Sequence, residues 1–172
     1  MTVEQAILTA MEHETKVRDL YAGEAAKATD PAARRVLELL SREEQGHLDY
    51  LADRLRTWRT EGRVDAVALA TQVPPRQVLE KAARTLSRRM EMSDEQRASA
   101  LATLRKAEAA ERATAEWYRA VVAGLPGEAG KAMFQRFLEI EDGHAAIVQA
   151  EIDSVTGLGF WFDVPEFRLE AE

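Results

Sequence analysis

Apolar side chains recur every three or four residues along most of this chain of 172 residues. This spacing places them on one face of an α-helix. It predicts four long helices, over about residues 2–29, 31–60, 93–123 and 128–156. The sequence is therefore predicted to form an all-α protein.

Signals for helix starts and stops support these boundaries. Thr2-x-x-Gln5 and Ser93-x-x-Gln96 have the form of capping boxes, in which the first side chain and the fourth satisfy free backbone N–H groups. Asp30-Pro31 separates the first two helices, because aspartate caps a helix and proline favours its first position. The glycines and the proline of residues 124–127 separate the last two.

The connections between the predicted helices differ in length. Short turns join the helices within each pair, whereas residues 61–92 join the two pairs and include a short extra helix predicted over 76–91. Two tight helix pairs and one long connection are the layout of a four-helix bundle with one crossover, which we expect to form a single domain over 1–156. Residues 157–172 form an irregular tail rich in aromatic side chains, which we expect to pack on the bundle or on a partner.

Composition narrows the class of protein. The net charge of −7 disfavours nucleic acid or an anionic membrane as a partner. No apolar run is long enough to span a bilayer, and the first residues lack the features of a signal peptide, so we expect a cytoplasmic protein. Cysteine is absent, which excludes disulfides, thiolate catalysis and cysteine-ligated metals.

A pattern of polar residues occurs twice, with a constant offset of 97 residues as from Glu14 to Glu111. Each copy reads Glu-x6-Tyr followed by Glu-x-x-His. The first copy consists of Glu14, Tyr21, Glu44 and His47, and the second of Glu111, Tyr118, Glu141 and His144. The offset predicts two helix pairs related by pseudo-twofold symmetry.

The repeated residues have the composition of a two-metal site. In each Glu-x-x-His the two side chains share one helix face, and a lone glutamate comes from each of the other two helices. Bundles that bind two iron or two manganese ions use this ligand set, whereas zinc more often takes fewer ligands. We expect Glu44 and Glu141 to bridge two ions, with Glu14 and Glu111 as terminal ligands.

A single Glu-x-x-His is a weak motif, because most such pairs lie on a solvated helix face. Here the chain has only 3 histidines, and two of them fall in the motif at equal distances behind a Glu-x6-Tyr. We therefore favour the metal interpretation. Tyr21 and Tyr118 lie two turns beyond Glu14 and Glu111, from where each phenol could hydrogen-bond a ligand carboxylate across the bundle.

Three further features are weaker. Glu108 lies one turn before Glu111 and is a candidate for an extra or alternate carboxylate ligand, a solvated glutamate being the equal alternative. His13 has no counterpart in the repeat, which favours a place at the surface or rim. Gly46 and Gly143 precede the two histidines and are predicted to leave room for a neighbouring helix, since glycine costs about 1 kcal/mol in a helix.

At these residues the chain resembles the rubrerythrin branch of the ferritin-like superfamily. The matching stretches are ETKVRDLY (14–21), EEQGH (43–47), ERATAEWY (111–118) and EIEDGH (139–144). The resemblance covers the four long helices, and the sequence GFWFDVPEF is similar to the tail of rubrerythrin-like bundle proteins. It implies a ferritin-like bundle that binds two iron ions, with manganese or a mixed pair as alternatives.

The chain departs from the rubrerythrin pattern in two ways. It lacks the cysteines of the rubredoxin-like domain, so the resemblance implies a separate electron donor. Rubrerythrins also carry a second carboxylate on the third helix, used when an iron ion changes its ligand. Here Thr114 stands three residues after Glu111, and Glu108 three residues before it.

The resemblance implies a redox protein that reduces hydrogen peroxide or oxidises ferrous iron. Two alternatives stay open: a ferritin-like storage or buffering protein without peroxidase turnover, and a bundle that binds metal without catalysis. We expect a homodimer, because the small size of the bundle and its apolar tail favour contacts with a partner. A helix pair could also be exchanged between the two chains through residues 61–92.

Overall fold

The computed structural model describes residues 1–29, 31–64, 68–72 and 93–156. Four helices account for most of them: α1 (Val3–Lys27), α2 (Pro31–Glu61), α4 (Asp94–Gly124) and α5 (Glu128–Thr156). No strand occurs in these ranges. The all-α prediction and the four long helices are confirmed. The helix predicted over 76–91 and the tail 157–172 lie outside the described residues.

The helix ends follow the local chemistry of the sequence. Thr2 Oγ1 accepts a hydrogen bond from Gln5 N at 3.2 Å, and Gln5 Oε1 accepts one from Thr2 N at 2.9 Å. Ser93 and Gln96 make the same reciprocal pair at the start of α4, with the same two distances. Between α4 and α5 the chain turns at Gly127, whose φ of 85° lies in the left-handed region that glycine adopts without strain.

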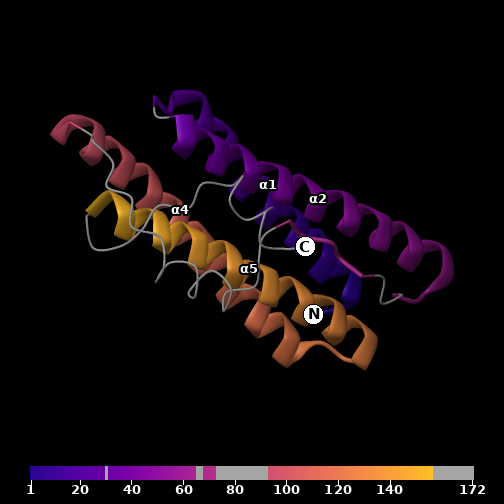
Figure 1. The fold of residues 1–172 in the computed structure, drawn as a ribbon. Coiled ribbons are helices and arrows are strands. Elements are labelled where there is room, and N and C mark those ends of the chain that lie inside the picture. The colour runs from indigo at the N-terminus through magenta and orange to yellow at the C-terminus, as the bar shows by residue number, and fades with distance from the viewer. Residues whose placement is uncertain (30, 65–67, 73–92, 157–172) are drawn as a thin grey trace, which may run out of the picture.

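Two helix pairs lie against each other to form a four-helix bundle (Figure 1). α1 packs along α2, α4 packs along α5, and α1 also contacts α4. None of the described helices is both long and apolar enough to cross a membrane. Because the two pairs come from the two halves of the chain, equivalent positions of the repeat face one another across the core.

The core consists of two apolar clusters, one towards each end of the bundle. The first contains Ile7, Ala10, Leu51, Val121, Phe134 and Phe137, among others. The second contains Val17, Leu40, Leu104, Ala107, Ile147 and Ile152, among others. On every helix the repeated glutamates and histidines fall between the residues of these clusters. Burial of the two clusters therefore holds a polar layer in the middle of the bundle, away from solvent.

The described part of the crossover lies against α2. Val64 and Leu69 are buried in the first apolar cluster, so the chain turns back towards the bundle directly after α2. Further along, Thr71 and Gln72 donate hydrogen bonds to the Glu43 carboxylate in the middle of α2. This brings the crossover to the level of the polar layer.

Candidate metal centre

The six glutamates and histidines of the repeat come together in the polar layer. All six are buried, and none exposes more than 1% of its surface. They form two groups of four, and in each group one potential ligand atom per residue lies within 4.8 Å of the others. The groups are Glu14, Glu44, His47 and Glu141, and Glu44, Glu111, Glu141 and His144. Glu44 and Glu141 belong to both.

Contacts within the layer place the two shared carboxylates between the histidines. His47 Nδ1 lies 3.0 Å from Glu44 Oε2 on its own helix and 3.3 Å from Glu141 Oε1 across the bundle. His144 Nδ1 lies 2.9 Å from Glu44 Oε1 and 3.6 Å from Glu141 Oε2. The two rings stack with centroids 5.3 Å apart. Each shared carboxylate therefore presents one oxygen to each histidine, the arrangement that a bridge between two ions requires.

Tyr21 and Tyr118 each make the hydrogen bond across the bundle that the sequence predicted. The Tyr21 hydroxyl, from α1, donates to Glu111 Oε1 on α4, and the Tyr118 hydroxyl, from α4, donates to Glu14 Oε1 on α1. Glu14 Oε2 meanwhile lies 3.0 Å from His47 Nδ1. Tyr118 therefore holds one oxygen of Glu14 and leaves the other beside His47, whereas Tyr21 donates to the same Glu111 oxygen that lies 3.9 Å from His144 Nδ1.

The polar layer has more buried acceptors than the protein supplies donors for. Although the two Nδ1 atoms are close, no hydrogen bond of normal geometry reaches either oxygen of Glu44 or Glu141 from the described residues. Buried carboxylates without partners each cost several kcal/mol, and they also repel one another. Two divalent cations would balance four carboxylates and supply the missing partners. The buried glutamates and histidines could therefore hold metal ions.

Without metal, the layer retains protons. Burial alone would lower the pKa of His47 and of His144, but the surrounding carboxylates, Glu44 foremost, raise the pKa of both well above its ordinary value. Burial and the nearby Glu141 carboxylate raise the pKa of Glu111 well above its ordinary value. Burial raises the pKa of both tyrosines, so the phenols remain hydrogen-bond donors.

These shifts predict the pH dependence of the metal-free protein. His47, His144 and Glu111 have higher pKa values in the folded protein than in the unfolded chain, so the folded state binds more protons. Their stabilisation is complete at pH below the unfolded values and is lost as the pH rises through the raised folded values. The slope is about 1.4 kcal/mol per pH unit for each extra proton.

The melting temperature of the protein in chelator should therefore fall as the pH rises above about 5. Thermal melts at a series of pH values would measure this trend. The metal-loaded protein is the control, and its melting temperature should rise over the same range because protons compete with metal for the ligands. A metal-free protein that gains stability with rising pH would contradict the expectation.

We expect that removing one tyrosine hydroxyl weakens metal binding but leaves the fold intact. Tyr118→Phe keeps the ring that packs on Phe134 and Phe137 but leaves Glu14 without its donor. Residues that hydrogen-bond a metal ligand typically contribute about 10–100-fold to metal affinity, so we expect the metal affinity of the variant to fall by about that factor. Titration calorimetry with Fe²⁺ or Mn²⁺ would measure it. Tyr21→Phe is the matched variant on the other side and should weaken binding similarly.

The weaker candidates lie away from the six residues. Glu108 accepts hydrogen bonds at 2.8 Å from Arg105 and from Arg112, and these arginines lower its pKa. Glu108 is absent from every potential metal-binding group among the described residues, so the structure supports a partly buried glutamate paired with two arginines, not an extra ligand. His13 is partly exposed and stacks on Trp117 at 4.9 Å, as expected for the rim of the bundle.

The steric role predicted for Gly46 is wrong. Gly46 is exposed, and a Cβ added there would meet no atom within 4 Å, because this face of α2 points to solvent. Its pseudo-equivalent Gly143 is buried. The repeat therefore conserves the residue type at these two positions without conserving the environment.

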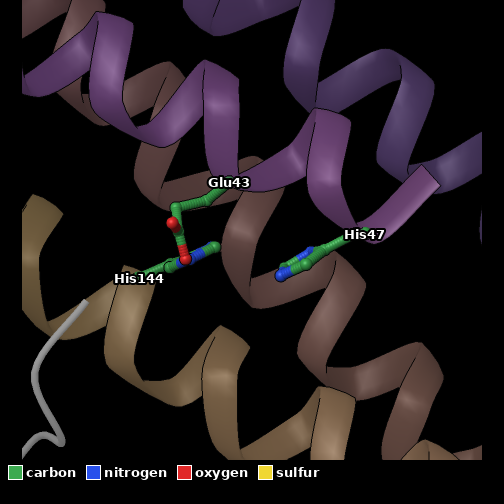
Figure 2. A group of neighbouring side chains, drawn as sticks. All are labelled: Glu43, His47 and His144. Atoms are coloured by element: carbon green, nitrogen blue, oxygen red, sulfur yellow. The ribbon is translucent and has the colours of Figure 1, made fainter. Parts of the chain in front are cut away.

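Glu43 is a residue that the sequence analysis missed. It is 8% exposed, and it forms a third group with His47 and His144 in which one potential ligand atom from each residue lies within 4.8 Å of the others. Figure 2 shows Glu43 and His47 on α2 and His144 on α5. The repeat could not reveal Glu43, because Ile140 stands at the equivalent position. Its spacing from His47, one helical turn, was the available signal.

A cavity of about 300 Å³ lies elsewhere, between the end of α1 and the starts of α2 and α4. Its lining includes Glu24, Lys27 and Glu151 together with apolar side chains of α2, α4 and α5. None of the six clustered residues lines this cavity, so the polar layer is a separate, enclosed site.

Fold and site together define the class: an all-helical four-helix bundle whose core contains clustered glutamates and histidines that could hold metal ions. No family model, curated protein or solved structure matches the chain. The function is therefore inferred from the residues and their geometry.

Proposed function

We propose that the protein binds two metal ions in its polar layer, with Glu14, Glu44, His47, Glu111, Glu141 and His144 as ligands. The observation that carries this proposal is the sharing of Glu44 and Glu141 between two groups of four potential ligands. A single-ion site would not need two buried quartets joined by two carboxylates. In the proposal these two residues bridge the ions, and each ion also receives one terminal glutamate and one histidine.

The donor set favours iron or manganese. Four carboxylates and two imidazoles are hard or borderline ligands, and the absence of cysteine removes the soft donors that select other metals. The enclosed position between two apolar clusters suits ions that stay with the protein. We propose two iron ions, with manganese or a mixed pair as alternatives.

The redox function that we propose is that of a rubrerythrin-type protein in a ferritin-like bundle, which reduces hydrogen peroxide or oxidises ferrous iron. When bound, the metal pair would supply the electrons and the coordination positions for such chemistry. The protein would contribute ligands, tyrosines that orient the terminal carboxylates and apolar clusters that limit water. Because the chain has no cysteine, a separate molecule would have to return the electrons.

Two measurements test this proposal. Metal analysis of protein purified without added metal should find two ions per chain. Stopped-flow mixing of the diferrous protein with peroxide should then show oxidation much faster than for free ferrous ion at the same concentration. Two bound ions with oxidation at the rate of free ferrous ion would eliminate the peroxidase function but leave the metal site. No bound metal, even after reconstitution, would eliminate both.

One observation favours the alternative of metal binding without peroxidase turnover. Thr114 is buried one turn beyond Glu111, where the resemblance would place a second carboxylate, and the other candidate, Glu108, is held by two arginines. An iron ion that needs an alternate carboxylate on α4 would not find one. A storage function would further require a closed cage, so the mass in solution separates it from the dimer that we expect.

A further inference from the structure

Glu43 occupies a position between the metal-binding histidines and the crossover. Its carboxylate is almost fully buried on α2, one turn before His47. A ring nitrogen of His47, a ring nitrogen of His144 and a Glu43 oxygen all lie within 4.8 Å of one another, and Figure 2 shows the carboxylate beside the His144 ring. No other carboxylate of the described residues outside the six proposed ligands joins the histidines in such a group.

Each of the two histidines has a ring nitrogen that lacks a hydrogen-bond partner among the described residues. Every close contact between a histidine and a ligand carboxylate uses Nδ1. A histidine that binds metal through Nδ1 carries its proton on Nε2, and that N–H group usually donates to a carboxylate, a carbonyl or a water. Here both Nε2 atoms are buried and have no hydrogen-bond partner among the described residues.

Residues of the crossover also hydrogen-bond Glu43. Thr71 Oγ1 donates to Glu43 Oε2, and the Gln72 backbone N–H lies 3.1 and 3.2 Å from the two oxygens. An ionised carboxylate offers about four acceptor positions, so these bonds leave some of them available for a further donor. The group can therefore accept from the crossover and from an imidazole at the same time.

We propose that Glu43 is a positioning residue that accepts the Nε2–H groups of the metal-bound histidines, directly or through one bridging water, and so couples residues 71–72 to the metal pair. This inference rests on the proposed metal site and adds a residue and a segment outside the ligand set. It has two consequences: loss of the Glu43 charge weakens metal binding, and metal binding tightens the attachment of the crossover.

The test compares Glu43→Gln and Glu43→Ala with Glu38→Gln, an exposed glutamate of the same helix that gives the same change of charge. Titration with Co²⁺ as the probe should show an affinity about 10–100-fold lower for Glu43→Gln than for the wild type, and at least as low for Glu43→Ala. Glu38→Gln should leave the affinity unchanged. Circular dichroism of each variant before the titration checks that it is folded.

A spectroscopic measurement separates positioning from a general loss of stability. In the Co²⁺ protein, the imidazole N–H protons give strongly shifted proton NMR signals that disappear in D2O. Glu43→Gln should move these signals or make them exchange faster, whereas Glu38→Gln should not. Hydrogen exchange of the Gln72 amide should slow on metal binding in the wild type and respond less in Glu43→Ala.

The outcomes are distinguishable. A wild type that binds no metal overturns the proposed function, and this inference with it. Two bound ions with equal affinity and unchanged N–H signals in Glu43→Gln overturn the role of Glu43 alone. Three bound ions in the wild type and two in Glu43→Gln would also overturn it, because Glu43 would then be a ligand.

Discussion

Glu44→Gln is expected to abolish binding of both metal ions, whereas Glu14→Gln and Glu111→Gln are each expected to remove only one. The reason is that Glu44 belongs to both groups of potential ligands, whereas Glu14 belongs only to the first group and Glu111 only to the second. Glutamine has the size of glutamate but no charge, and its amide nitrogen cannot bind a cation. The three variants thus differ mainly in how many groups they disturb.

Melting temperature gives the second readout of the same variants. At a free metal concentration 1,000 times the dissociation constant, each bound ion stabilises the fold by about 4 kcal/mol. For a chain of this length, that corresponds to a rise of about 8–16 °C per ion. Saturating Mn²⁺ should therefore raise the melting temperature most for the wild type, about half as much for Glu14→Gln, and hardly at all for Glu44→Gln.

Metal analysis after gel filtration gives the ratio of ions to protein for each variant. Glu116→Gln, at an exposed position of α4, serves as the control and should keep two ions. A Glu44→Gln protein that retains one tightly bound ion would show that Glu44 is a terminal ligand, and the bridging assignment would be wrong.

The sequence could predict the helices and the six clustered residues because both depend on local spacing. Helix length follows from the apolar periodicity and the capping boxes, which act within a few residues. The Glu-x-x-His spacing puts two groups on one face, and the offset of 97 indicates that the halves of the chain repeat the same pair. Together these features require only that two similar helix pairs pack face to face.

Glu43 and Gly46 show where such reasoning fails. Glu43 is buried because Thr71 and Gln72, far along the chain, cover it, and no local spacing encodes that contact. Gly46 follows the repeat, yet it faces solvent on α2 while Gly143 is buried on α5. The symmetry of the sequence holds for the groups in the polar layer, and it fails at neighbouring positions, where Glu43 contacts the crossover and Gly46 faces solvent.

Glu141→Met is expected to change stability in opposite directions with and without metal. In the metal-free protein, Glu141 is a fully buried carboxylate, and its oxygens receive no hydrogen bond of normal geometry from the described residues. Replacing buried ion pairs by apolar side chains of similar volume often stabilises a protein by about 1–4 kcal/mol, and here four buried carboxylates outnumber the two imidazoles that could pair with them. The metal-free variant should therefore melt about 2–16 °C above the metal-free wild type.

In the presence of metal the order should reverse. The wild type gains about 4 kcal/mol per ion at 1,000 times the dissociation constant, and Glu141→Met gains little because it lacks a carboxylate shared by both groups. Differential scanning calorimetry of both proteins, in chelator and in Mn²⁺, would measure the four melting temperatures. Glu139→Met, at an exposed position of the same helix, should stay within about 0.5 kcal/mol of the wild type in both conditions.

This reversal of the melting temperatures separates the energetic contribution of the metal site from that of ordinary core packing. An ordinary core residue contributes the same sign of stability whether or not metal is present, so its substitution lowers both melting temperatures. A carboxylate kept in the interior to bind cations opposes folding until the cations arrive. If Glu141→Met lowered the melting temperature of the metal-free protein by as much as that of the metal-loaded one, Glu141 would be a structural residue, and the buried layer would need another explanation.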